Sequence, residues 1–442
     1  MRVADPLVTR SDVKTLGTLG LLLAVLPVNA AVTAVALVRS QLVPADRAEA
    51  TEPRTVLITG GKMTKSLQLA RSFHRAGHRV VLVESPNYWL TGHRFSRAVD
   101  RFVTVPDPQS EGYVDALVRL VDDESVDLFV PVSSPAASRY DAQVAQALAG
   151  RCDVMHGDPA GVDQLDDKAA FCAVAASLGL SVPDSHRITD PQQVLDFDFT
   201  ASGRRYVLKS IPYDPVRRLD LTLLPCATPA GTAAFVRGLP ISEQTPWIMQ
   251  EFITGQEYCT HSTVRDGRVQ LHCCCESSAF QINYAMVHKP AIEAWVTAFV
   301  GGLGLTGQVS LDFLETADGE LFAIECNPRT HSAITMFYAN DDVAGAYLDR
   351  DVPVVQPLAS SRPTYWLYHE VWRALRHPRT LPERVRVLRH GKDAIFDWAD
   401  PLPFLMVHHV QIPWLLVQNL RRRTGWHHLD FNIGKLVEPG GD

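Results

Sequence analysis

The chain has no C-x-x-C pair among its eight cysteines, no internal repeat and no low-complexity stretch. Without such cysteine pairs, a zinc knuckle or a thioredoxin-like redox site is not supported. A basic excess is also missing, because 42 Lys+Arg stand against 49 Asp+Glu, a formal charge of −7. That balance argues against a nucleic-acid partner. With 46% hydrophobic and 21% charged residues, the 442-residue chain is predicted to be globular, with about three domains.

One long apolar run departs from this pattern. Leu16 to Val38 carries no charge over 23 residues, a length that can span a bilayer. Pro27 and Asn29 weaken a spanning helix, because one removes a backbone hydrogen bond and the other places an amide in lipid. A secretory signal cleaved near Ala30 and a buried helix of a soluble protein are the alternatives. We expect residues 1–45 to be a retained membrane anchor with its linker and the catalytic part to be cytoplasmic, since the chemistry inferred below requires ATP.

Short strands and helices alternate over the next hundred residues. Residues 55–59 and 79–84 are apolar strands, and 63–76 between them has a helical pattern that ends at Gly77. Strand, helix and strand in about thirty residues predict a βαβ unit with parallel strands. The Gly60-Gly61-Lys62 turn matches neither a dinucleotide-binding nor a P-loop motif, which disfavours an oxidoreductase. The sequence therefore predicts a Rossmann-like α/β domain over residues 54–150.

A mixed α+β body is predicted over residues 151–350. A helix is expected from Asp166 to Leu178, and Asp-Gly turns at 266–267 and 318–319 indicate antiparallel hairpins. The expected strands are 206–209, 246–252, 269–275, 308–314 and 321–326. Residues 351–442 form a C-terminal extension whose uncharged stretch, Pro401 to Leu420, ends at three arginines. That stretch is either an interfacial membrane helix or, as is commoner, a segment packed on the catalytic body.

Charged and polar residues at strand ends of this body suggest a nucleotide site. Lys168 opens a helix, and Lys209 closes an apolar strand, where a lysine needs a carboxylate, a phosphate or solvent. After the next strand, a linker can meet a purine edge, and Glu257 can accept hydrogen bonds from a ribose. The linker comprises Gln250, Glu251, Phe252 and Ile253.

Oxygen ligands for a metal ion follow further along the chain. Asp312 interrupts an apolar strand, and Glu325 and Asn327 lie two residues apart, so they share one face of a strand. Hard oxygen ligands of this kind suit Mg²⁺ bound to phosphates. Arg329 can clamp phosphate oxygens with two hydrogen bonds.

The order of these features resembles the ATP-grasp superfamily. The resemblance implies an ATP-grasp fold of mixed α/β and α+β class, with an N-terminal pre-grasp domain preceded here by a hydrophobic helix. It implies phosphate contacts for Lys168 and Lys209, adenine contacts for residues 250–253 and ribose contacts for Glu257. Asp312, Glu325 and Asn327 would hold Mg²⁺, for which Mn²⁺ could substitute, and Arg329 and Lys209 would be catalytic. The glycine-rich flap of most members is missing, and Arg217 and Arg218 stand in its place.

Several longer segments are similar to the mycosporine-glycine synthases of mycosporine-like amino acid biosynthesis. They include WIMQEFITGQEYCTHSTVRDG, SSAFQINY and ECNPRTHSAITMFY. This resemblance implies that glycine is joined to the cyclohexenone 4-deoxygadusol at the expense of ATP. An amino-acid ligase acting through an acyl phosphate and a membrane-tethered nucleotide-binding module are the alternatives. The acceptor pocket is expected among polar residues that could also be hydrogen-bonded core residues: His261, Ser262, Gln281, Asn283, His331 and Ser332.

Overall fold

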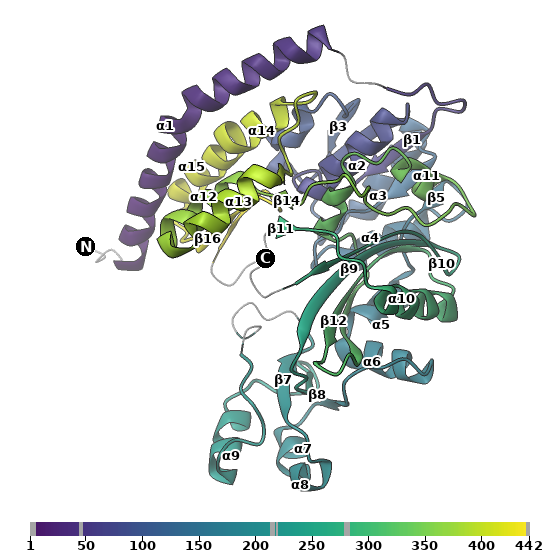
Figure 1. Ribbon diagram of the computed structural model, residues 1–442, viewed down its shortest axis with the longest axis vertical. Helices are drawn as coiled ribbons and strands as arrows, with labels where there is room; N and C mark the ends of the chain where they lie inside the picture. Colours follow the sequence, from purple (N-terminus) through teal and green to yellow (C-terminus); the bar gives the residue numbers. More distant parts are fainter. Residues whose placement is uncertain (1–5, 44–46, 213–216, 218–219, 278–282, 439–442) are drawn as a thin grey trace.

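A long N-terminal helix lies along one flank of the protein. The computed structural model describes residues 6–43, 47–212, 217, 220–277 and 283–438. Helix α1 (Pro6–Leu42) runs beside the C-terminal helices, as Figure 1 shows in purple. It contains the whole apolar run and ends at Leu42. By length and composition, it is the single helix of the described residues that could cross a membrane.

A five-stranded parallel sheet with helices on both faces follows α1. Its order is β3-β2-β1-β4-β5, so the direction of strand addition reverses between β1 and β4. Val56 and Ile58 pack with Phe73 of α2 on one face, whereas Leu57 packs with Leu117 of α3 on the other. This alternation along one strand confirms the expected α/β layers. The elements are β1 (Thr55–Ile58), α2 (Thr64–Arg75), β2 (Arg79–Glu84), η1 (Pro86–Tyr88), η2 (Gly92–Phe95), β3 (Arg101–Thr104), α3 (Tyr113–Glu124), β4 (Leu128–Val130), α4 (Ser138–Ala147) and β5 (Asp153–Val154).

Two antiparallel sheets make up the central part of the chain. A three-stranded sheet has the order β6-β8-β7, and a four-stranded sheet has the order β10-β9-β12-β13. The predicted strands are present, each with ends within two residues of those expected. The elements are α5 (Pro159–Asp166), α6 (Lys168–Ser177), β6 (Ser185–Ile188), α7 (Pro191–Leu195), α8 (Phe199–Ser202), β7 (Tyr206–Ser210), α9 (Pro229–Arg237), β8 (Trp247–Glu251), β9 (Gln256–Arg265), β10 (Arg268–Glu276), α10 (Pro290–Leu303), β12 (Gly307–Glu315) and β13 (Leu321–Asn327).

The β9–β10 hairpin turns at Asp266 and Gly267, as predicted. Both residues have positive φ, 50° and 75°, which is the left-handed pair that a tight hairpin requires. Glycine adopts this conformation freely, and aspartate is among the side chains that tolerate it. The turn places β9 between β10 and β12, at the centre of the four-stranded sheet.

The C-terminal part packs into the same hydrophobic cluster as α2 and the parallel sheet. Phe404, Val407, Ile412 and Leu416 are buried there, so the uncharged stretch packs on the body of the protein. Trp366 joins them and donates its indole N–H to Thr64 at 3.0 Å. The elements are β11 (Asn283–Tyr284), η3 (Ser332–Phe337), α11 (Val343–Leu348), β14 (Thr364–Tyr365), α12 (Leu367–Arg376), η4 (Pro378–Thr380), α13 (Leu381–His390), β15 (Lys392–Asp393), α14 (Leu402–Met406), the π-helical η5 (Val407–Gln411), α15 (Ile412–Arg422), β16 (His428–Asp430) and β17 (Lys435–Val437).

Buried histidines make the fold sensitive to acid. Burial lowers the pKa of His93 to about 4, while its Nδ1 donates to the carbonyl of Gly61. Between pH 6.5 and about 4 the unfolded chain therefore binds a proton that the folded chain excludes, and stability falls as the pH falls. We expect His93→Gln to make the unfolding free energy, measured by urea titration, less dependent on pH by about 3 kcal/mol over this interval. Exposed His377→Gln is the control, and an unchanged slope in His93→Gln would contradict the assignment.

Candidate nucleotide and metal site

A cavity of about 670 Å³ lies between the three-stranded and the four-stranded sheets. Its walls come from β7 and β8 on one side and from β9, β12 and β13 on the other, with the start of α6 at one end. The volume is in the range of small-molecule sites. A cleft between two packed sheets can bury a ligand of nucleotide size on both faces.

One part of the cavity wall is apolar. It includes Val207, Leu221, Leu314 and Ile324, together with Phe252 and Ile253 of the predicted linker. Gln250, Glu251 and Glu257 line the same cavity. The residues that were expected to contact adenine and ribose therefore lie together. The side chain of Gln250 donates to the carbonyl of Ile324 at 3.2 Å, which ties the two sheets across the cleft. Such a wall suits a flat aromatic ring.

Besides Arg217, three cationic side chains line the same cavity: Lys168, Lys209 and Arg329. Lys168 pairs with Glu325 at 3.0 Å, and Lys209 donates to the side-chain oxygen of Gln250 at 3.0 Å. Burial would lower the pKa of Lys168, but Glu325 outweighs burial and the pKa is raised. For Lys209, burial prevails and the pKa is lowered, with the charge of Lys168 adding to the effect. Polyanionic phosphates would relieve this crowding of positive charge.

Arg329 forms the third positive charge and is held by two neighbours. Its guanidinium pairs with Asp166 at 2.7 Å and also donates to the side-chain oxygen of Asn327. Asn327 is absent from the residues that line the cavity, although it lies next to Arg329 on this network. In the structure described here, Asn327 thus positions the arginine.

Carboxylates face the cations. Asp312 and Glu325 are paired positions on the neighbouring strands β12 and β13, so their side chains project from the same face of the sheet. Burial, followed by the negative charges of Glu325 and Glu257, raises the pKa of Asp312 to about 8. A divalent cation would remove this repulsion. Among the described residues, no three His, Cys, Asp or Glu side chains form a metal cage by themselves. Asp312 and Glu325 offer hard oxygen donors of the kind that suit Mg²⁺.

The predicted acceptor residues are dispersed. His331 lines the cavity beside Tyr284, with ring centroids 5.3 Å apart, and burial lowers the pKa of His331 to about 3. His261 accepts from the backbone N–H of His331 at 3.3 Å and lies behind it. Arg217 lines the cavity, whereas Gln281 and Arg218 lie outside the described residues. The remaining members have partners away from the cavity: Ser262 with His272, Asn283 with Glu370 and Ser332 with Asn432.

Sequence reasoning missed a buried lysine behind the site. Lys65 in α2 donates to the carbonyl of Thr330 at 2.6 Å, directly after Arg329. Burial, aided by the charge of Arg329, lowers the pKa of Lys65 to about 7. Tyr284 and Leu221 were also missed as cavity residues. A lysine on the apolar side of an amphipathic helix was the available signal for Lys65.

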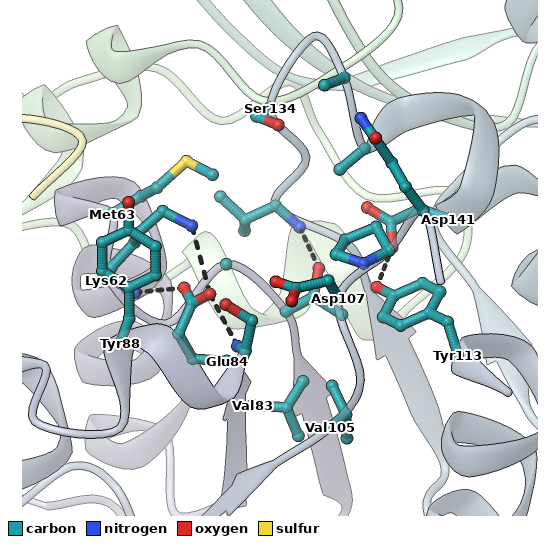
Figure 2. A pocket seen from close by; sticks show the side chains of 18 of the residues that line it. Lys62, Met63, Val83, Glu84, Tyr88, Val105, Asp107, Tyr113, Ser134 and Asp141 are labelled. Carbon is teal, nitrogen blue, oxygen red and sulfur yellow. Dashed lines mark hydrogen bonds and ion pairs between the residues drawn. The ribbon is translucent and has the colours of Figure 1, made fainter. Parts of the chain in front are cut away.

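A second cavity, of about 400 Å³, opens at the carboxyl ends of β1, β2 and β4 (Figure 2). In open α/β sheets, ligands bind at this edge, where the strand order reverses. Lys62 pairs with Glu84 at 3.2 Å, and this charge outweighs burial and raises the pKa of Lys62. Both cavities reach the turn after β4, where Pro135 lines the first cavity and Ser134 the second.

Comparison with known proteins identifies the fold. No protein-family model and no curated protein matches the sequence. Among solved structures, N5-carboxyaminoimidazole synthetase from Staphylococcus aureus complexed with ADP matches with a TM-score of 0.52 and 15% identity, over 72% of this chain and 82% of that chain. The ADP complex of an N5-carboxyaminoimidazole ribonucleotide synthetase gives 0.55 and 14%, over 76% and 88%. A biotin carboxylase from Campylobacter jejuni gives 0.50 and 14%, over 67% and 72%. The chain has the ATP-grasp fold.

Proposed function

We propose that this protein is an ATP-dependent ligase that forms a carbon–nitrogen bond. The observation that carries the proposal is the convergence, in one cavity between two antiparallel sheets, of three cations with the carboxylates of Asp312 and Glu325. An apolar wall at the other part of the cavity suits a purine. Structures with this fold hold ADP, which supports ATP as the phosphoryl donor.

Each group of residues has a distinct task in the proposed reaction. Lys168, Lys209 and Arg329 offset charge on the phosphates, and Glu257 orients the sugar. Asp312 and Glu325 would hold Mg²⁺, which would supply positive charge to neutralise the phosphates. The enclosing sheets exclude water, so that a phosphorylated intermediate meets an amine before it is hydrolysed. Most of the rate enhancement would come from positioning and fixed charge.

For the substrates, we propose glycine and the cyclohexenone 4-deoxygadusol, with mycosporine-glycine as the product. A phosphoryl group would move to the enol oxygen, and the amine would then displace phosphate from the ring carbon with loss of one proton. The sequence similarity to mycosporine-glycine synthases supports this choice. Neutral His331, whose Nδ1 accepts from the N–H of Ala333, presents an uncharged N–H at Nε2 to the cavity. The second cavity, which reaches the same turn after β4, offers a compartment for a small acceptor and is lined by cationic Lys62.

The test is ADP release by the full-length chain with Mg²⁺-ATP, glycine and 4-deoxygadusol, each omitted in turn. We use the full chain because Thr15 of α1 accepts a hydrogen bond from Trp426, so the helix is part of the packed protein. ADP and a new ultraviolet-absorbing amine adduct are expected only in the complete mixture.

Other outcomes would distinguish the proposed substrates from another ligase reaction and from nucleotide binding without turnover. ADP release with an amino acid and a carboxylate, but none with the cyclohexenone, would favour the acyl-phosphate ligase. ATP binding by calorimetry without ADP release under any pairing of acceptors would favour a binding module. The proposed use of cellular ATP places the catalytic body in the cytoplasm.

A further inference from the structure

In helix α1, polar side chains face the body of the protein and most of the large apolar side chains face outward. This is the reverse of the arrangement in a water-soluble protein. Four of its described side chains are buried, and two of these are threonines, Thr15 and Thr33. Ten leucine and valine side chains keep 39% or more of their surface exposed. These are Val13, Leu16, Leu21, Leu23, Val25, Val28, Val32, Val35, Val38 and Leu42. An amphipathic helix on a soluble body turns its apolar face inward, so the outward face of α1 requires a different surrounding.

The inward stripe is regular, and its members Thr15 and Asn29 hydrogen-bond to the body of the protein. Its polar members recur at intervals that match the helical repeat: Ser11, Thr15, Thr18, Asn29, Thr33 and Ser40. Asn29 donates to the hydroxyl of Tyr368 at 2.6 Å and lies 2.7 Å from the ring nitrogen of His409. Trp426 donates to Thr15 at 2.8 Å, and Lys14 donates to the carbonyl of His427 at 2.7 Å. These bonds, spread along the helix, fix which face of α1 is turned outward.

A second apolar and basic surface lies beside α1. Helix α12 reaches α1 where the hydroxyl of Tyr368 accepts a hydrogen bond from Asn29. The pKa of Lys14 in α1 is lowered by burial first and then by the charge of Arg376, at the other end of α12. Helices α12 and α13 expose five large apolar side chains, Val371, Trp372, Leu375, Leu381 and Val385. Together with η4 between them, they also carry four exposed arginines, Arg376, Arg379, Arg386 and Arg389, in a chain whose net charge is −7.

We propose that α1 and the α12–α13 hairpin dock this protein on the surface of an anionic lipid bilayer, with α1 lying in the membrane plane. The apolar side chains would enter the boundary between headgroups and acyl chains, and the arginines would meet anionic headgroups. Trp372 and Trp398, each about half exposed and each near an arginine, are suited to this interface.

The packing argues for this orientation over two others. If α1 crossed the bilayer while bonded to the body, α12 and its arginines would enter the hydrocarbon, which is costly. If a second copy covered the face through a two-fold axis, the same arginine-rimmed surface would meet itself, and like charges would be opposed. An anionic bilayer satisfies both the apolar strip and the positive charge.

The experiment is flotation of the full-length chain with vesicles of phosphatidylcholine alone or mixed with phosphatidylserine. We expect binding to the mixed vesicles. Leu21→Glu with Val28→Glu should reduce binding at least tenfold while leaving the unfolding free energy unchanged, because both side chains are 65% exposed on the outward face. The matched control is Val354→Glu with Leu358→Glu, each 42% exposed outside this surface, and it should bind normally.

A second variant tests the contribution of the arginines to vesicle binding. Arg386→Gln with Arg389→Gln should weaken binding to the mixed vesicles about 25-fold, at about fivefold for each arginine, and should reduce the salt dependence. Equal losses in the Val354 and Leu358 control would overturn the proposal. Absence of vesicle binding together with a dimer that Leu21→Glu and Val28→Glu dissociate would assign the surface to a second copy. Resistance to alkaline carbonate extraction would show that α1 spans the membrane and would likewise overturn the in-plane orientation.

Discussion

Replacing Glu325 by glutamine will lower the rate of ADP formation by about 10²- to 10³-fold at saturating Mg²⁺-ATP. Glu325 pairs with Lys168 at 3.0 Å and lies opposite Asp312 across β12 and β13. A glutamine keeps the shape of the side chain but removes the charge that would hold the metal ion and one lysine. The rate loss should come with a weaker dependence on Mg²⁺ concentration, measured from initial rates.

The matched control is Glu320→Gln, an exposed glutamate that precedes the same strand. It should retain activity and affinity for the nucleotide. Thermal unfolding of both variants separates a catalytic loss from a folding defect, since Lys168 loses its partner only in Glu325→Gln. Full activity in a folded Glu325→Gln protein would contradict the proposal that Glu325 is a metal ligand. The main support for phosphoryl transfer would then be lost.

Local signals predicted most of the strands and several residues that line one cavity. Alternating apolar residues and Asp-Gly turns depend on neighbours in the sequence, and the hairpin at Asp266 formed where they indicated. Lys168, Lys209, residues 250–253 and Glu257 line one cavity because each lies near the end of a helix or strand whose position the motif order implied. Short-range pattern and motif order are sufficient for such features.

Other features depend on partners that a single sequence does not reveal. Ser262 was assigned to the acceptor pocket from its position on a strand, but its cross-strand neighbour His272 provides its hydrogen bond. The pairing of Arg329 with Asp166 joins residues 163 positions apart. The apolar run was interpreted by its length, which concealed the polar stripe of α1 that includes Thr15 and Asn29. Periodicity within the run would have indicated a two-faced helix.

Long-range pairing also determines the second large effect that we expect. Asp400→Ala should lower the unfolding free energy by about 3–5 kcal/mol in urea titrations followed by circular dichroism. Asp400 accepts from Arg71 of α2 at 2.9 Å and from Ser96 at 2.6 Å, and both charged side chains are over 90% buried. Removing the carboxylate leaves the guanidinium of Arg71 buried without its counter-charge.

An exposed pair of the same chemistry provides the control. Arg151 and Asp122 lie 2.6 Å apart with about half of each side chain in solvent, so Asp122→Ala should change the unfolding free energy by no more than about 1 kcal/mol. A loss in Asp400→Ala as small as that in the control would show that the C-terminal part is not held to α2 by this pair. A large loss would have a functional consequence as well, because α2 also carries Lys65, whose contact with Thr330 supports the loop that presents Arg329 to the cavity. The C-terminal part would then stabilise the nucleotide site from a distance, through a helix that does not itself line the nucleotide cavity.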